Sequence, residues 1–133
     1  GMEKIMIKFV VNWGFNMQEN MITYKIYKNV YDEMASGKEN VEIRLLNEKS
    51  QKIKIGDKIT FQVVDSDLTL VVEVTNKYIY SNVDELWEEK AIVSNNTLNY
   101  TKEEFACALY EIFGKDKVVS SKIVGIEFKI LKK

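Results

Sequence analysis

The sequence predicts an α+β protein that is mainly β, built as a small mixed or antiparallel barrel with about three short peripheral helices. Several stretches alternate apolar and polar residues, which is the period of a strand with one face in a core. The stretches between residues 57 and 79 follow each other through the hairpin connection Asp65-Ser66-Asp67, without a crossover helix. A doubly wound parallel sheet requires such helices, so this class of fold is excluded.

Length and composition fit a single globular domain over residues 1–133. Of the 133 residues, 46% are hydrophobic and 29% are charged, which suffices for a core without metal or disulfide support. No apolar run reaches the roughly 18 residues of a membrane span, and three charged residues interrupt the stretch 2–11. We therefore expect no membrane partner and a cytoplasmic location.

Two residue types limit the chemistry of the chain. Histidine is absent and Cys107 is the one cysteine, which excludes zinc sites of the usual kind, Ser-His-Asp triads and Cys-His dyads. We predict no metal and no cofactor, and we expect Cys107 to be a small buried residue of a helix. The net charge of −1 argues against a general affinity for nucleic acid, so such binding would need a local basic patch.

The first part of the chain predicts strands on either side of one short helix. Apolar residues at odd positions from 5 to 13 predict the first strand, and a second follows at Ile22, Tyr24 and Ile26. The helix is expected to begin after the N-cap Asn29 and to end at Gly37. Its inward-facing residues are predicted to be Val30, Met34 and Tyr31.

The middle of the chain predicts a hairpin. Residues 47–52 are polar and without a period, and Gly56-Asp57 is a turn signal. The strand after this turn is expected to bury Ile59, Phe61 and Val63. The return strand should bury Leu68, Leu70, Val72 and Val74, and continue through Tyr78, Ile79 and Tyr80.

The last part predicts two helices and a closing strand. Ser81 or Asn82 caps a helix through Trp87, whereas 90–99 gives no clear pattern. Thr101 and Glu104 have the spacing of a capping box, with Tyr100 and Phe105 as a hydrophobic staple. This helix should place Phe105, Leu109 and Ile112 on one face and end at Gly114. The closing strand carries Val124, Ile126, Phe128 and Ile130.

The stretch from Ser36 to Arg44 contains the best candidate site. After Gly37 the chain enters a strand in which Val41, Ile43 and Leu45 occupy one face. Glu42 and Arg44 share the other face, because strand side chains alternate with a period of two. A carboxylate and a guanidinium are thus expected side by side next to a glycine-containing turn.

The order of these segments resembles the ASCH domain family, a branch of the PUA-like superfamily. The likeness rests on the helix ending in Ser36-Gly37, the strand 41–45, the stretch 52–61 and the terminal 125–128. It covers about residues 21–131, which leaves 1–20 as an extension with one added strand. The resemblance implies a PUA-like barrel with helices around a cleft, and a role in binding RNA or a nucleotide-like ligand.

The family motif runs Gly-x-Lys-x-x-Glu-x-Arg, and this chain retains Gly37, Glu42 and Arg44 in register. Glu39 stands where the family has lysine, with Lys38 one position earlier. In the acetylcytidine amidohydrolase branch, the lysine activates a threonine at the position of Glu42. Because both residues differ here, we predict no catalytic residue, and that activity is not carried over.

The predicted ligand-binding residues comprise the motif and two lysines of the polar stretch, namely Gly37, Lys38, Glu39, Glu42, Arg44, Lys52 and Lys54. The alternative for Glu42 and Arg44 is a structural ion pair. The basic cluster of Lys49, Lys52, Lys54 and Lys58 could be a phosphate-contacting edge or an ordinary solvated loop. Two other functions are open: a hydrolase of a modified nucleoside with Glu42 or Glu39 as general base, and a protein-interaction module with a vestigial cleft. The tyrosines could include a base-stacking residue, but are expected to be packing residues.

Overall fold

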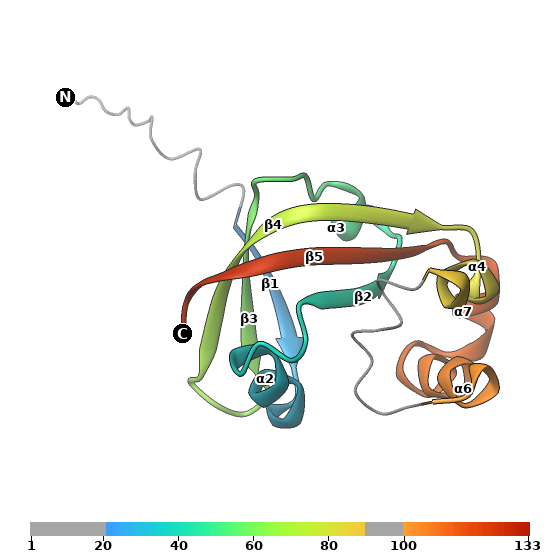
Figure 1. Cartoon of the computed structure of the whole chain (residues 1–133), viewed down its shortest axis with the longest axis horizontal. Helices are drawn as coiled ribbons and strands as arrows, with labels where there is room; N and C mark the ends of the chain where they lie inside the picture. The colour runs from blue at the N-terminus through green and yellow to red at the C-terminus, as the bar shows by residue number, and fades with distance from the viewer. Residues whose placement is uncertain (1–20, 90–99) are drawn as a thin grey trace.

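The computed structural model describes residues 21–89 and 100–133 (Figure 1). The predicted strand over 5–13 and the stretch 90–99 lie outside these residues. The elements, in chain order, are β1 (Met21–Ile26), α2 (Lys28–Ala35), β2 (Val41–Leu45), α3 (Glu48–Gln51), β3 (Lys58–Val63), β4 (Thr69–Tyr80), α4 (Val83–Glu88), α6 (Lys102–Phe113), α7 (Lys115–Ser120) and β5 (Ile123–Lys132).

The five strands form one curled, mixed sheet in the order β1-β3-β4-β5-β2. β1 pairs in parallel with β3, and the other three pairings are antiparallel. β4 pairs with both β3 and β5, and its register with β5 shifts between Val71 and Val72 and between Val74 and Asn76. Such irregularities bend a strand, and the result is the half-barrel of Figure 1. The predicted small mixed barrel is thereby confirmed, with an opening between β1 and β2.

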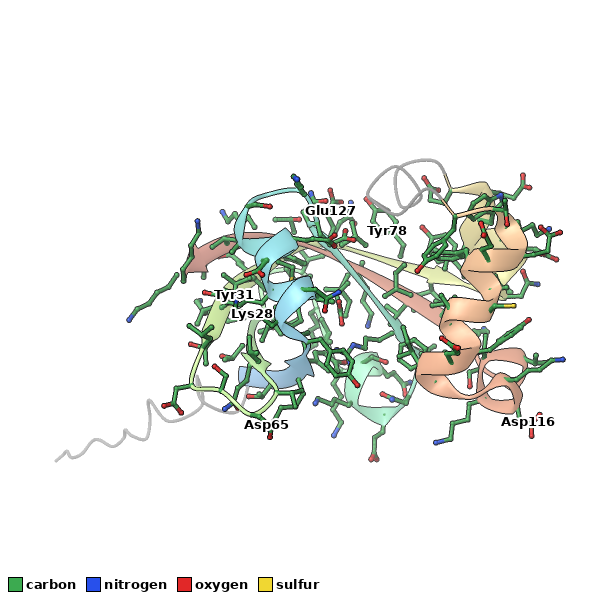
Figure 2. All side chains as sticks on the ribbon, turned by 90° about the horizontal axis from the view of Figure 1, so that it is seen from below. Lys28, Tyr31, Asp65, Tyr78, Asp116 and Glu127 are labelled. Carbon is green, nitrogen blue, oxygen red and sulfur yellow. The ribbon has the colours of Figure 1, made fainter. Side chains whose placement is uncertain are left out.

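Alternate residues of the shared strands enter two separate apolar clusters. The barrel core lies against α2 and consists of Tyr24, Ile26, Met34, Ile53, Ile59, Phe61, Val63, Leu70, Val72, Val74, Val124, Ile126 and Phe128. The second cluster, here called the helix-side core, lies against α4, α6 and α7 and consists of Val41, Tyr80, Leu86, Phe105, Leu109, Val118 and Ile123. Figures 1 and 2 show α2 at one end of the sheet and these three helices at the other.

A polar bridge joins β4 and β5 on the face of the helix-side core. The Tyr78 hydroxyl donates to Glu127 Oε1 at 2.8 Å and accepts from Asn76 Nδ2 at 3.0 Å. Figure 2 shows Tyr78 and Glu127 next to each other. The proton of this phenol and one of its lone pairs therefore have partners, unlike the hydroxyls of two buried tyrosines described below.

Local signals at the helix ends are largely confirmed. Thr101 and Glu104 form the predicted capping box, and the Tyr100 and Phe105 rings lie 6.3 Å apart. Asn82, rather than Ser81, accepts from Glu85 N and caps α4. α2 ends as predicted, because Gly37 adopts a φ of 85°, a conformation that a side chain disfavours.

Two predictions at the first helix and the hairpin are wrong. α2 begins directly after β1 with Tyr27 at the N-cap position and no side-chain cap, so Asn29 is already inside the helix. Leu68 is 41% exposed because it belongs to the connection and β4 starts only at Thr69.

Two predictions for α6 are also wrong. Ile112 is 66% exposed, because the buried stripe of α6 is confined to Phe105 and Leu109. Cys107 is exposed rather than buried, since it lies on the side of the helix away from that stripe.

The described residues contain five short helices instead of about three. α3 arises within the polar stretch, where Asn47 and Ser50 form a reciprocal capping box. α7 follows Gly114 and buries Val118 in the helix-side core. A helix of four or six residues is too short to show an apolar period, which is why both were missed.

Candidate functional site

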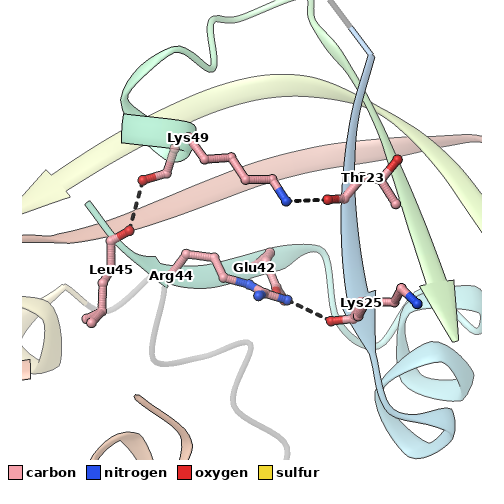
Figure 3. Close-up of polar contacts among 7 residues, drawn as sticks. Thr23, Lys25, Glu42, Arg44, Leu45 and Lys49 are labelled. Carbon is pink, nitrogen blue, oxygen red and sulfur yellow. Dashed lines mark hydrogen bonds and ion pairs between the residues drawn. The ribbon is translucent and has the colours of Figure 1, made fainter. Parts of the chain in front are cut away.

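The opening between β1 and β2 is bridged by side chains instead of by a backbone ladder. Arg44 Nη2 donates to the Lys25 carbonyl at 3.1 Å, and Lys49 Nζ donates to the Thr23 carbonyl (Figure 3). Thr23 and Lys25 are alternate residues of β1, so both carbonyls point away from β3 toward the open edge. We call this place the seam, defined by Thr23, Tyr24, Lys25, Arg44 and Lys49.

Glu42 and Arg44 face the seam from β2. Arg44 Nε donates to Glu42 Oε2 at 2.5 Å, and the side chains are 23% exposed for Arg44 and 12% for Glu42. Burial raises the pKa of Glu42, and the adjacent guanidinium opposes this shift. The two residues share the strand face opposite Val41, as the period of two predicts.

Tyr24 of β1 lies beneath this pair. Its ring centroid is 4.3 Å from Arg44 Cζ and 4.1 Å from Lys49 Nζ, and its ring stacks on Phe61 at 6.4 Å. The residue is 6% exposed, so its ring is packed against neighbours and is not a free platform for a base. The expectation that Tyr24 is a packing residue is therefore correct for its ring.

Glu39 lies in the turn before β2, close to the Glu42 carboxylate. Its Oε1 accepts from Val41 N at 3.3 Å, and the side chain is half-buried. Burial raises the pKa of Glu39 to about 7, and the neighbouring Glu42 and Glu33 add to the rise while the backbone N–H bonds oppose it. Lys38, by contrast, is exposed, so the position next to Glu42 is occupied by a carboxyl group and not by an amine.

Of the predicted basic cluster, the structure brings Lys49 to the seam, and not Lys52 or Lys54, the two named as ligand-binding residues. Lys52 and Lys54 are exposed, and no hydrogen bond or ion pair joins their side chains to Glu42 or Arg44 among the described residues. Lys49 is brought to the site because α3 presents it toward β1. The capping-box spacing of Asn47 and Ser50 is the sequence signal that predicts α3 and hence Lys49.

Contacts with β2 and β4 hold α3 in place. The buried Ser50 hydroxyl donates to the Leu45 carbonyl at 2.8 Å. Lys77 Nζ reaches three carbonyls at the end of the helix, at 2.9 Å to Ser50, 3.2 Å to Gln51 and 2.8 Å to Ile53. Burial lowers the pKa of Lys77, whereas Asp57 opposes that shift. The position of Lys49 at the seam thus rests on contacts with β2 and β4.

Within residues 21–89 and 100–133, no group of three or more acidic, histidine or cysteine side chains is arranged to hold a metal ion. None of the helices in the same ranges is both long and apolar enough to cross a membrane. The seam and the adjoining Glu42 together offer a carboxylate, a guanidinium, an ammonium and a phenol.

The described residues form an open mixed half-barrel with peripheral helices, and comparisons with known proteins find the same fold elsewhere. Neither the models of protein families nor the curated proteins gave a match to this chain. Solved structures did. The hypothetical protein PH0355 superposes with a TM-score of 0.72 at 23% identity, over 84% of this chain and 99% of that chain.

Two other solved structures have the same fold, and the second of them is named as an ASCH domain. Protein EF3133 from Enterococcus faecalis V583, of family DUF984, has a TM-score of 0.63 at 15% identity, over 96% of this chain and 95% of that one. An ASCH domain from Lactobacillus crispatus JV V101 has a TM-score of 0.61 at 14% identity, over 98% and 94%. The chain therefore has an ASCH-like fold, as the motif resemblance implied.

Proposed function

We propose that this protein is an ASCH-type binding module that recognises RNA or a nucleotide-like ligand at the seam and the adjoining segment 37–44. The observation that carries the proposal is the carboxylate of Glu42 beside the guanidinium of Arg44, 2.5 Å apart and mostly buried. A base edge that carries an amine next to an acceptor complements such a pair, because Glu accepts from the amine and Arg donates to the acceptor.

Arg44 retains donors for this task. A guanidinium carries five N–H groups, and the described contacts occupy one toward Glu42 and one toward the Lys25 carbonyl. Lys49 supplies a second cation at the seam, and it has no carboxylate partner among the described residues. Phosphate contacts of a nucleotide would suit Lys49, whereas the base edge would suit Glu42 and Arg44.

The proposal predicts a preference that can be measured. Cytidine and adenosine monophosphates carry an exocyclic amine, whereas uridine and inosine monophosphates carry a carbonyl that would meet the Glu42 carboxylate. We expect the amine-bearing members to bind about tenfold or more tightly in calorimetric titrations, since one matched base contact contributes about 1–3 kcal/mol. Equal affinity for cytidine and uridine monophosphates, and for adenosine and inosine monophosphates, would contradict the proposal. So would the absence of binding of any nucleotide or of single-stranded RNA at low salt.

The variants for this test must keep the fold. Arg44→Lys retains the positive charge beside Glu42 but removes the planar fork, so we expect weaker binding with a folded domain. Lys49→Gln should weaken the binding of phosphate-bearing ligands and lower the salt dependence of that binding. Both effects should be larger than those of Lys52→Gln combined with Lys54→Gln. Lys117→Gln on α7, at the far end of the molecule from β1, is the control for loss of one charge (Figure 1).

A second candidate function is hydrolysis of a modified nucleoside. It is favoured by Glu39, because a carboxyl group with a pKa of about 7 is suited to accept a proton from a bound water near neutral pH. Incubation with a panel of acylated nucleosides decides this candidate. Turnover that is lost in Glu39→Gln would support it, and no turnover of any member would end it.

A further inference from the structure

Two buried tyrosine hydroxyls have no hydrogen-bond partner among the described residues, on Tyr24 and Tyr80. Both residues are 6% exposed. A buried hydroxyl that lacks a partner destabilises a protein by about 1–3 kcal/mol, so each such group requires an explanation. Tyr80 lies in the helix-side core, whereas Tyr24 lies at the seam, with Arg44 and Lys49 over its ring.

Two cations that carry only donor groups lie over the Tyr24 ring. Arg44 and Lys49 have only N–H groups, so neither accepts the phenolic proton. The neighbouring acceptor, Glu42 Oε2, is bound by Arg44 Nε. Burial raises the pKa of Tyr24, with Arg44 opposing the rise, so the hydroxyl keeps its proton at neutral pH and acts as a donor. The Tyr24 hydroxyl is thus a donor that contacts no acceptor among the described residues.

We propose that the Tyr24 hydroxyl donates a hydrogen bond to an acceptor oxygen of the ligand, a carbonyl or phosphate oxygen, and so contributes to ligand selection at the seam. This inference rests on the proposed function and adds a contact to it. Lys49, which lies over the ring, is held by a hydrogen bond to the Thr23 carbonyl, and its long side chain can swing aside to admit the ligand. The ligand would then replace Lys49 over part of Tyr24.

Removing the hydroxyl alone separates a binding role from a structural one. Tyr24→Phe retains the ring, its contacts with the two cations and its stacking on Phe61. Because the free protein loses no hydrogen bond, we expect an unchanged or higher urea midpoint. If the hydroxyl contacts the ligand, the dissociation constant should rise about tenfold, which corresponds to the loss of one hydrogen bond. Weaker binding without loss of stability is the expected signature.

Tyr80→Phe is the matched control. It removes an equally buried hydroxyl without a partner, but from the helix-side core, where the Tyr80 ring lies 6.5 Å from that of Tyr78. It should leave the urea midpoint equal or higher, as Tyr24→Phe does, and leave the dissociation constant unchanged. A fall in affinity of the same size in both variants would show that the effect is not specific to the seam, and would overturn the inference.

The probes are cytidine, adenosine and uridine 5′-monophosphates, titrated into the wild type, Tyr24→Phe, Tyr80→Phe and Arg44→Lys. If Arg44→Lys weakens binding and Tyr24→Phe stays within twofold of the wild type, the inference is wrong and the proposed function stands. If Tyr24→Phe loses both affinity and stability, the hydroxyl is structural and the inference is again wrong. If the wild type binds none of the probes or single-stranded RNA, both proposals fail.

Discussion

Replacing Arg44 by alanine is expected to destabilise the domain severely, because it isolates a buried carboxylate. Glu42 is 12% exposed, and its ion pair is the bond of 2.5 Å to Arg44 Nε. Breaking a buried pair by removing one partner destabilises a protein by about 3–5 kcal/mol. The same change removes the hydrogen bond to the Lys25 carbonyl and the contact with the Tyr24 ring, so the seam between β1 and β2 loses one of its two bridges.

Urea denaturation measures this effect directly. With a slope of about 2 kcal/mol per molar, a loss of about 4 kcal/mol lowers the midpoint by about 2 M. The double variant Glu42→Gln with Arg44→Ala should recover at least half of the loss, since its buried side chain is neutral. Arg44→Ala alone should also recover at acidic pH, because protonation of Glu42 removes the isolated charge.

Two results would refute this reasoning. A loss below about 1 kcal/mol in Arg44→Ala would mean that the pair behaves like a solvent-exposed salt bridge. A double variant as unstable as the single one would mean that the isolated Glu42 charge is not the cause. In the first case the alanine variant keeps its fold and would become a clean test of ligand binding by Arg44.

Three further outcomes are expected. The pKa of Glu39 is 4.5 in the unfolded chain and about 7 in the fold, so the folded state binds more protons between these values and stability falls as pH rises from 4.5 to 7. Glu39→Gln should therefore reduce by about 1–3 kcal/mol the difference in unfolding free energy between pH 5 and pH 8, and an unchanged difference would contradict the assignment. Lys77→Met removes the ammonium that binds three carbonyls at the end of α3 and should cost about 2 kcal/mol by urea denaturation, whereas a change within 0.5 kcal/mol, roughly, would contradict that role. Thr101→Ala removes the cap of α6 and should lower the unfolding free energy by about 1 kcal/mol, with no effect on nucleotide titrations.

Much of the fold follows from local patterns. The buried faces of β3 and β4 were predicted at Ile59, Phe61, Leu70 and Val72, because a period of two is a property of the strand itself. The α6 capping box was predicted because its atoms lie within one helical turn. The errors at Leu68 and Ile112 arise at the ends of elements, where burial depends on whether another element continues to cover the chain.

The candidate site likewise combines features that follow from local sequence with features that depend on tertiary packing. The sequence by itself determined that Glu42 and Arg44 share one face, since two residues along a strand always do. Only the tertiary structure decided that Tyr24 and Lys49 join them, because this requires β1 to pair with β3, the sheet to curl, and α3 to present its lysine across the opening. The tertiary structure also decided the elevated pKa of Glu39. Burial and the approach of Glu33 and Glu42 depend on how the chain packs, and not on the amino-acid sequence around Glu39 alone.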